Sequence, residues 1–286
     1  MQKKNSINPS IVTICVNYLN EEDTLLFVND LINLKGYENG IVIIVVNKEA
    51  SPLLRGFMEE KKVVIKYPDK NLGYFGGANW ALQEYLQTAP LPEWIIISNT
   101  DIRFEDKDFF LKLKNYYTNK IDNIGIIAPD IELKSREGLP SSYKHQNPHM
   151  EYPPKRWKLN FLKLISKSYI FYIVFQIFSS LRYMILNKFF VRKLPNHPIS
   201  IYAPFGAFII FHKNYFEKGG NLNFKNFLFG EEIFVAETAK RLGLKIIYDP
   251  RLKVYHYEHG ALKKLPSRKQ FFYFRNAIDY ILSNYK

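Results

Sequence analysis

WIIISNTD, residues Trp94–Asp101, is the segment around which the chain is organised. Its apolar part, with three consecutive isoleucines, predicts a strand buried on both faces, and it ends abruptly in the polar residues 98–101. In an open parallel sheet, ligands and metal ions bind at the carboxyl ends of strands. The place of Asp101 therefore predicts a divalent cation that holds a diphosphate. The alternative is that Asp101 caps a helix beginning near Asp106 or closes a turn.

Strands and helices alternate on the amino-terminal side of this segment. Apolar runs predict further strands, and the residues between them follow helical periodicity. Such alternation is typical of a mostly parallel sheet wrapped by helices. The sequence therefore predicts an α/β protein in which residues 1–128 form a nucleotide-binding half. The predicted strands are Ser10–Tyr18, Ile41–Val46 and Val63–Tyr67, and the predicted helices are Glu21–Leu34 and Ala78–Gln87.

The carboxyl-terminal part predicts a second half, residues 199–286, of the same domain. The run ISIYAPFGAFIIFH reads as a strand, a turn at Gly206 and another strand, and a helix follows Gly230 and ends near Gly243. The closing segment is helical. The remaining expected elements are a helix at Asp106–Tyr117, strands at Ile124–Ala128, Lys245–Tyr248 and Leu252–Tyr255, a turn at Asp249–Pro250, and a polar loop at Pro129–Pro154.

Composition limits the class of protein. The chain has 286 residues, of which 47% are hydrophobic, so a large core is expected. One cysteine, Cys15, excludes a disulfide framework, and no apolar signal sequence precedes the first strand, so a cytoplasmic protein is expected. The formal net charge of +13 predicts an anionic partner, for which nucleic acid, a sugar nucleotide and anionic lipid all qualify.

Residues 155–194 differ in composition from the rest. They are basic, aromatic and helical in propensity, and no Asp or Glu occurs between Tyr152 and Phe216. The longest apolar run there is far shorter than the roughly 20 residues that a spanning helix needs. The pattern favours an interfacial helix pair on an anionic membrane surface, with Trp157, Phe161 and Phe175 at the acyl boundary. The alternative is a helical hairpin packed on the main domain or on a second subunit in a homodimer.

Five short motifs together resemble those of the family-2 glycosyltransferases, especially the rhamnosyltransferase-like branch of bacterial surface polysaccharide synthesis. They span roughly residues 10 to 276. The resemblance implies a GT-A fold, a nucleotide-diphosphate sugar donor, a divalent metal ion and inversion at the anomeric carbon. The motifs are Asn71–Asn79 (NLGYFGGAN), Asn99–Asp101 (NTD), Phe229–Ile233 (FGEEI) with Arg241–Gly243, Val254–His256 followed by Gly260, and Tyr273–Asn276.

The resemblance implies that Asp101 and His256 bind the metal ion, Mn²⁺ or Mg²⁺. A hard cation neutralises a leaving diphosphate well, which agrees with the chemistry that the transfer needs. An imidazole ligand suits Mn²⁺ better than Mg²⁺. His259 is the competing candidate for His256, and a hydrogen-bonded surface histidine is the alternative without a metal.

Polar residues at strand ends and the glycine-rich segment are expected to bind the donor. The segment is not a dinucleotide fingerprint, because it follows the third strand and lacks G-x-G-x-x-G. Family members usually have Asp-Asn at the end of the second strand, where Asn47 stands here. Because an amide both donates and accepts hydrogen bonds, the identity of the nucleotide base in the donor stays open. Asn79 is expected to open the next helix. The expected donor-binding residues are Asn17, Tyr18, Asn20, Asn47, Asn71, Gly73, Gly77, Asn79, Asn99 and Thr100.

The pair Glu231 and Glu232 opens a predicted helix, where unpaired N–H groups favour an ionised carboxylate. An inverting transfer needs a general base for the acceptor hydroxyl. By resemblance the second residue of the pair, Glu232, is that base, while the alternative is that the pair only satisfies the helix terminus. Gly206 and Ala207 resemble the small residues beneath the acceptor.

These features predict a metal-dependent inverting glycosyltransferase. The donor is a UDP- or dTDP-sugar, and the acceptor is a saccharide, expected to be linked to polyprenyl diphosphate at the inner face of the plasma membrane, in capsule, O-antigen or cell-wall synthesis. Two alternatives are a catalytically impaired scaffold of the same fold and a nucleic-acid-binding protein. The second is disfavoured because the basic residues cluster with long aliphatic runs and form no recognisable motif.

Overall fold

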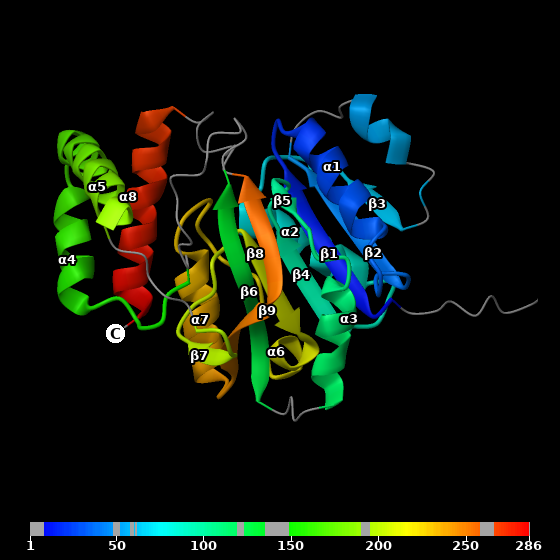
Figure 1. Cartoon of the computed structure of the whole chain (residues 1–286). Coiled ribbons are helices and arrows are strands. Elements are labelled where there is room, and N and C mark those ends of the chain that lie inside the picture. The colour runs from blue at the N-terminus through cyan, green and yellow to red at the C-terminus, as the bar shows by residue number, and fades with distance from the viewer. Residues whose placement is uncertain are drawn as a thin grey trace, which may run out of the picture.

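The computed structural model describes residues 9–47, 52–57, 60, 62–118, 123–134, 149–189, 195–257 and 266–285. In these residues one sheet of nine strands forms the centre, and helices lie on both of its faces (Figure 1). The strands are β1 (Ile11–Asn17), β2 (Gly40–Val46), β3 (Val63–Lys66), β4 (Trp94–Ser98), β5 (Ile102–Arg103), β6 (Ile124–Lys134), β7 (Ile199–Ile201), β8 (Phe208–His212) and β9 (Lys245–Tyr257). The α-helices are α1 (Glu21–Ile32), α2 (Tyr74–Leu86), α3 (Phe109–Lys114), α4 (Arg156–Ile165), α5 (Tyr169–Phe189), α6 (Lys213–Glu217), α7 (Glu231–Arg241) and α8 (Ser267–Asn284), with short 3-10 helices at Pro52–Phe57 and Asn115–Thr118.

The amino-terminal half of the sheet is parallel, as the sequence predicts. Strands β3, β2, β1 and β4 lie side by side in that order, and each neighbouring pair runs in the same direction. All five residues of β4 are buried. Ile96 packs in the core that contains α1 and α3, whereas Ile95 and Ile97 pack in the core that contains α2 and α7. The prediction of a strand buried on both faces is confirmed.

The second half makes the whole sheet mixed. Strand β8 is antiparallel to both β4 and β6, and β9 is parallel to β6 but antiparallel to β5 and β7. The expected α/β class with a helix-flanked central sheet is confirmed. The carboxyl end of β4 consequently meets the residues just before β8 and the end of β9.

Strands β6 and β9 are both longer than expected. Strand β6 continues past Ala128 into the predicted loop, and β9 runs through Asp249–Pro250, where a turn was expected. The two irregularities coincide, because Pro129 pairs with Asp249 and the next pair is Asp130 with Lys253. This shift lets the extra residues of β9 bulge out, so the ladder continues past two prolines that cannot donate to it.

Helix α2 begins at Tyr74, before the expected start at Ala78. Gly76 and Gly77 therefore lie inside the helix, and Gly73 precedes it in a left-handed conformation with φ of 73°. A Cβ on Gly77 would lie 3.4 Å from side chains of β1 and β2, so the small residue permits close packing of the helix on the sheet. Asn79 lies within the helix and does not open it, which corrects that expectation.

Helices α4, α5 and α8 form a layer beyond α7, at the left of Figure 1, which we call the helical layer. It contains the predicted helical segment, whose described part is the hairpin α4–α5. Helix α8 joins the layer to the domain, because its Ile281 packs with Leu159 of α4 and Ile233 of α7. No helix among the described residues is long and apolar enough to cross a membrane.

Candidate active site

Asp101 and His256 meet at the carboxyl end of β4. Asp101 lies three residues after the end of β4, and the short pairing of β5 with β9 sets Ile102 opposite His256. The N–H of Tyr257 donates to the carbonyl of Asp101 at 2.9 Å. The Nε2 atom of His256 consequently lies 3.1 Å from Oδ1 of Asp101, and both side chains are buried.

Asp101 and His256 contact each other directly, and the same spacing is that of two adjacent ligands of a divalent cation. With bonds of about 2.1 Å and octahedral geometry, two adjacent ligand atoms lie about 3.0 Å apart. A phosphate-bound Mg²⁺ commonly takes only one or two ligands from protein side chains. Nδ1 of His256 is buried without a hydrogen-bond partner among the described atoms. No group of three or more His, Cys, Asp or Glu side chains that could hold a metal occurs in the described ranges, and His259 and Gly260 lie outside them.

The turn Phe205–Ala207 connects this pair to the glutamates of α7. The N–H of Gly206 donates to Oε1 of Glu232 at 3.3 Å, and the carbonyl of Ala207 accepts from the N–H of Asn99 at 2.8 Å. A Cβ on Gly206 would lie 2.7 Å from Oε1 of Glu232, so a larger residue would displace the carboxylate. The ring of Phe205 lies 5.9 Å from the ring of His256. One short turn thus contacts the predicted base and the predicted metal ligand.

Glu231 and Glu232 occupy the first turn of α7, after Gly230 in a left-handed conformation. Burial raises the pKa of Glu231 to about 8, with the neighbouring charge of Glu232 as the second cause. Burial also raises the pKa of Glu232, while its own backbone N–H and that of Gly206 oppose the shift. Oε2 of Glu231 is buried and has no partner among the described atoms. The hydrogen bond from Gly206 therefore favours the negative charge on Glu232, whereas burial favours the protonated form of Glu231.

Tyr74 is a site residue that the sequence reasoning missed, although it stands within the quoted motif. Its hydroxyl donates to the carbonyl of Gly206 at 2.9 Å. Burial raises the pKa of Tyr74 well above its ordinary value, and the charges of Glu231, Glu232 and Asp101 raise it further, in that order. The hydroxyl is therefore a permanent donor. It lies within electrostatic range of both the predicted base and the predicted metal ligand.

His149 is a second residue that was missed, because it stands in a segment read as a polar loop. Its Nδ1 accepts from the N–H of Phe205 at 2.8 Å, and its Nε2 lies 2.7 Å from the carbonyl of Pro129. A carbonyl only accepts, so Nε2 carries the proton. Burial lowers the pKa of His149 to about 4, which keeps the ring neutral. The ring therefore holds the turn at Phe205 against the bulge of β6.

The amides of Asn17 and Asn47, expected to contact the donor, bond within the protein. Nδ2 of Asn47 donates to the carbonyl of Gly73 at 3.0 Å, and its Oδ1 accepts from the N–H of Leu72 at 3.3 Å. Nδ2 of Asn17 donates to Oγ1 of Thr24 at 2.8 Å. Both groups therefore fix the surroundings of the expected donor site, and Asn47 uses both ends of its amide on the glycine-rich segment.

Several other expected donor residues lie in the loops that follow β1, β3 and β4. Oδ1 of Asn71 accepts from the N–H of Gly73 at 2.9 Å, which tightens the turn before α2. Nδ2 of Asn20 donates to Oγ1 of Thr100 at 3.3 Å, linking the loop after β1 to the loop after β4. Tyr18 lies in the turn between β1 and α1 and is half-buried.

Arg103 also supports this edge and was not predicted. Its guanidinium donates to the carbonyl of Thr100 at 3.1 Å and to Oδ1 of Asp23 at 2.9 Å. The side chain therefore ties the loop that carries Asp101 to the first turn of α1. Its position two residues after the NTD motif is the signal that points to it.

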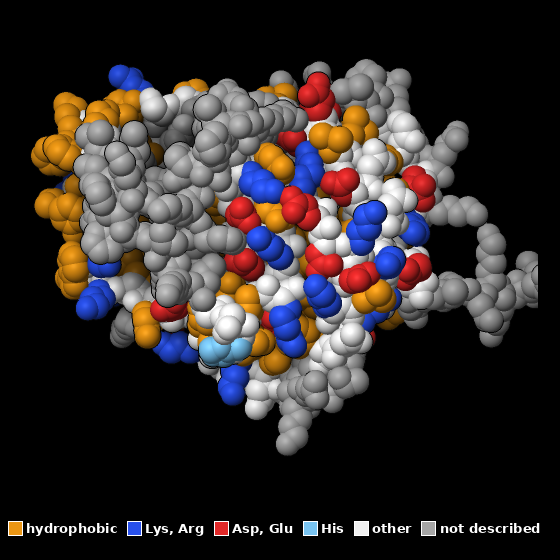
Figure 2. Space-filling view, viewed as in Figure 1, with side chains coloured by type: hydrophobic (Ala, Val, Ile, Leu, Met, Phe, Trp, Pro, Cys, Tyr) orange, Lys and Arg blue, Asp and Glu red, His pale blue; other side chains and the backbone are white. Residues whose placement is uncertain are grey.

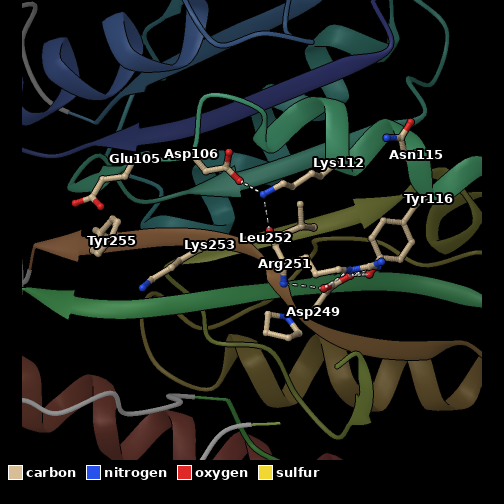
Figure 3. Close-up of a pocket in the computed structure, with 11 residues that line it drawn as sticks. Glu105, Asp106, Lys112, Asn115, Tyr116, Asp249, Arg251, Leu252, Lys253 and Tyr255 are labelled. Carbon is tan, nitrogen blue, oxygen red and sulfur yellow. Dashed lines mark hydrogen bonds and ion pairs between the residues drawn. The ribbon is translucent and has the colours of Figure 1, made fainter. Parts of the chain in front are cut away.

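A separate pocket of about 680 Å³ lies along α3 and the bulged part of β9 (Figure 3). Its cations are ion-paired, Lys112 with Asp106 at 2.5 Å and Arg251 with Asp249 at 2.6 Å. None of the residues predicted for the donor, acceptor or metal lines it. This pocket is therefore distinct from the site at Asp101.

Comparison with known proteins identifies the fold. No family model and no curated protein sequence matches the chain. Similar solved structures are Staphylococcus aureus TarS 1-349 in complex with UDP-GlcNAc (TM-score 0.56, 13% identity, 96% of this chain and 67% of that chain) and GalNAc-T7 with UDP, GalNAc and Mn²⁺ (TM-score 0.55, 10% identity, 88% and 44%). A third is the mannosyltransferase PcManGT from Pyrobaculum calidifontis with GDP-Man and Mn²⁺ (TM-score 0.52, 12% identity, 96% and 65%).

The chain has the GT-A glycosyltransferase fold that these structures share. It spans 44% of the GalNAc-T7 chain and about two thirds of the other two. At 10% to 13% identity, the comparison establishes the architecture, and the chemistry must be argued from the site.

Proposed function

We propose that this protein is a metal-dependent glycosyltransferase that moves a sugar from a nucleotide diphosphate to a saccharide hydroxyl, with inversion at the anomeric carbon. The observation that carries the proposal is the turn at Gly206. It bonds to Glu232 on one side and, through Ala207, to the polar end of β4 on the other. A carboxylate base and a buried Asp–His pair are thereby held at one edge of one sheet.

The donor end of the proposed site contains Asp101 and His256. These residues would hold Mn²⁺ or Mg²⁺, which when bound neutralises charge on the leaving diphosphate. The turn at Asn71–Gly73, fixed by Asn47, leads into α2, whose first N–H groups are suited to an anion. The three similar structures were solved with UDP, GDP-Man or UDP-GlcNAc, and UDP or dTDP is the carrier we expect here.

The acceptor end contains Glu232. Its carboxylate would take the proton of the acceptor hydroxyl as the oxygen attacks the anomeric carbon from the side opposite the diphosphate. A half-buried carboxylate with a raised pKa suits this role, because a base works best with a pKa near the operating pH. Gly206 and Ala207 are the small residues that we expect beneath the acceptor. Tyr74 orients the turn by donating to Gly206.

The biological setting is also part of the proposal. The rhamnosyltransferase-like motifs point to bacterial capsule, O-antigen or cell-wall polysaccharide, and a saccharide on polyprenyl diphosphate is the acceptor we expect. The basic helical layer supports a location at the inner face of the plasma membrane.

The experiment is a donor screen on the full chain. Thermal shift with Mn²⁺ and a panel of UDP-, dTDP- and GDP-sugars identifies the carrier, since a ligand that binds the native state raises the melting temperature. Donor turnover and the anomeric configuration of the product are then followed by NMR. An inverted product that depends on Mn²⁺ and on Glu232 is expected. Retention, or turnover unaffected by chelation of the metal, would contradict the proposal.

A further inference from the structure

The helical layer has an outward face of large apolar side chains. On α4 they recur at intervals of three and four residues, and on α5 they form one stripe, as expected for a single helix face. Their exposed fractions run from 43% for Val174 to 70% for Ile170. The orange side chains at the left edge of Figure 2 belong to this region. The set is Trp157, Phe161, Leu164, Ile170, Phe171, Val174, Ile177 and Phe178.

The opposite faces of these helices are packed, so the stripe is not an unfilled core. Tyr172 of α5 contacts the rings of Phe271 and Phe274 of α8, with centroid distances of 5.3 Å and 5.2 Å. Leu159 of α4 is buried in a cluster with α7 and α8. The layer is therefore seated on the domain through one side and presents the other to its surroundings.

The charged residues around the stripe indicate what kind of partner binds it. Lys155, Arg156, Lys158 and Lys167 are exposed on or beside α4, and Arg268, Lys269 and Arg275 are exposed on α8. The three helices contain one acidic residue, Asp279, which is ion-paired with Lys163. An aromatic stripe bordered by cations, and almost free of carboxylates, has the chemistry of an interfacial helix on anionic lipid.

We propose that the outer face of the helical layer binds the surface of an anionic bilayer. Trp157, Phe171 and Phe178 enter the boundary between headgroups and acyl chains, and Lys158 and Lys167 contact lipid phosphates. The membrane is the partner that would present the lipid-linked acceptor, so this proposal extends the proposed function. Only the purpose of the binding rests on that function. The binding itself needs neither donor nor metal.

Helix α8 links this surface to the site. Its Tyr273 stacks on Phe227 at 4.7 Å, and the carbonyl of Phe227 approaches Gly73 so closely that a Cβ there would lie 2.5 Å away. Its Ile281 packs near Gly230 at the start of α7. The helical layer thus adjoins the glycine-rich segment and α7, the helix that carries Glu232.

Flotation of the full chain with vesicles tests the proposal. Wild type is expected to float with phosphatidylcholine mixed with phosphatidylglycerol, and to float poorly with pure phosphatidylcholine or in high salt. The double variant Phe171→Ser/Phe178→Ser should bind at least about tenfold more weakly, since the apolar area buried in lipid sets the affinity. The matched control Leu26→Ser/Leu111→Ser removes exposed apolar side chains from α1 and α3, and should float like wild type.

Tryptophan fluorescence locates the contact. Trp94 is buried and Trp80 half-buried, whereas Trp157 is 63% exposed. Anionic vesicles should shift the emission to the blue in wild type and in Trp80→Phe, but not in Trp157→Phe. Absence of that shift in wild type, or equal flotation of the double variant and wild type, would overturn the proposal.

Two further measurements separate the alternatives. If sedimentation without lipid shows a dimer that Phe171→Ser/Phe178→Ser dissociates, the face is an interface between copies of this chain and the membrane proposal is wrong. A Glu232→Gln protein should float like wild type. Loss of transferase activity and loss of lipid binding are therefore separate results, and failure of either proposal is recognised on its own.

Discussion

The end of the sheet around Asp101 and the helical layer differ in the kind of side chain that each buries or exposes. At the sheet edge, polar groups are buried and nearly every one is held by a named partner, such as Asn47 on Gly73 or His149 on Phe205. In the helical layer, large apolar groups are exposed and cations surround them. Exposing apolar groups costs stability, and so does burying Nδ1 of His256 and Oε2 of Glu231 with no hydrogen-bond partner among the described atoms, so each region indicates contact with something outside the protein.

We expect the substitution Asp101→Asn to have the largest effect. Transfer should fall by about three orders of magnitude, because a cation on the leaving diphosphate contributes several kcal/mol. Calorimetric titration should also show weaker Mn²⁺ binding. Asp106→Asn is the control, since Asp106 is ion-paired with Lys112 outside the site. Full activity in Asp101→Asn would exclude the metal role.

Glu232→Gln tests the acceptor end. We expect kcat to fall by about 10²- to 10⁴-fold with little change in KM for the donor. In wild type, activity should be lost as the pH falls through the pKa of Glu232, which burial raises. That acidic limb should remain in Glu231→Gln, because Glu232 keeps its hydrogen bond from Gly206 in this variant. A Glu231→Gln enzyme without the limb would reverse the two roles.

Gly206→Ala sharpens the geometry of the turn. The new Cβ would meet Oε1 of Glu232 at 2.7 Å, so the carboxylate or the turn must move. We expect kcat to fall by about ten- to a hundredfold, as a small misplacement of a catalytic group can cost that much. Gly56→Ala, where a Cβ meets nothing within 4 Å, should leave kcat unchanged. Equal activity of the two variants would show that the close contact between Gly206 and Glu232 has no effect on catalysis.

The two regions should also differ in stability. Ile96→Ala in β4 creates a cavity in a fully buried site and should lower the free energy of unfolding by about 2 to 5 kcal/mol. Phe171→Ser on the outer face of α5 should change it by less than about 0.5 kcal/mol in the absence of lipid. Urea unfolding measures both. A large loss in Phe171→Ser would mean that the stripe belongs to the core.

Stability should also depend on pH. Burial lowers the pKa of His149 to about 4, below its unfolded value near 6.5, so the unfolded chain binds more protons between those values. The free energy of unfolding should therefore decrease as the pH falls from about 6.5 to about 4, by roughly 1 to 3 kcal/mol. The free energy of unfolding of His149→Gln should decrease less steeply over this pH range. His212, whose pKa burial also lowers to about 4, contributes to the decrease that is left. An unchanged slope would contradict this.

The sequence was sufficient for features that depend on local pattern. The apolar run Trp94–Ser98 predicted burial on both faces, because such a run has no side that tolerates water. The alternation of strands and helices predicted the parallel half. The motifs placed Asp101, His256 and Glu232 near one edge of the sheet, and their roles remain predictions.

Other features depend on long-range contacts that no local pattern carries. Apolar runs do not record strand direction, so the antiparallel return of β8 was missed. The prolines at 129 and 250 predicted chain breaks, but the two irregularities coincide across the ladder and both strands continue. His149 looked like a loop residue, because its partners Pro129 and Phe205 are distant in sequence.

The most direct test of the central claim is a crystal structure of the full chain with Mn²⁺ and UDP, recorded at the manganese absorption edge. We expect an anomalous peak bonded to Oδ1 of Asp101 and Nε2 of His256, and diphosphate oxygens on the side that faces Glu232. A manganese ion bound elsewhere, or a nucleotide that leaves the Asp101–His256 pair and Glu232 in separate clefts, would contradict it.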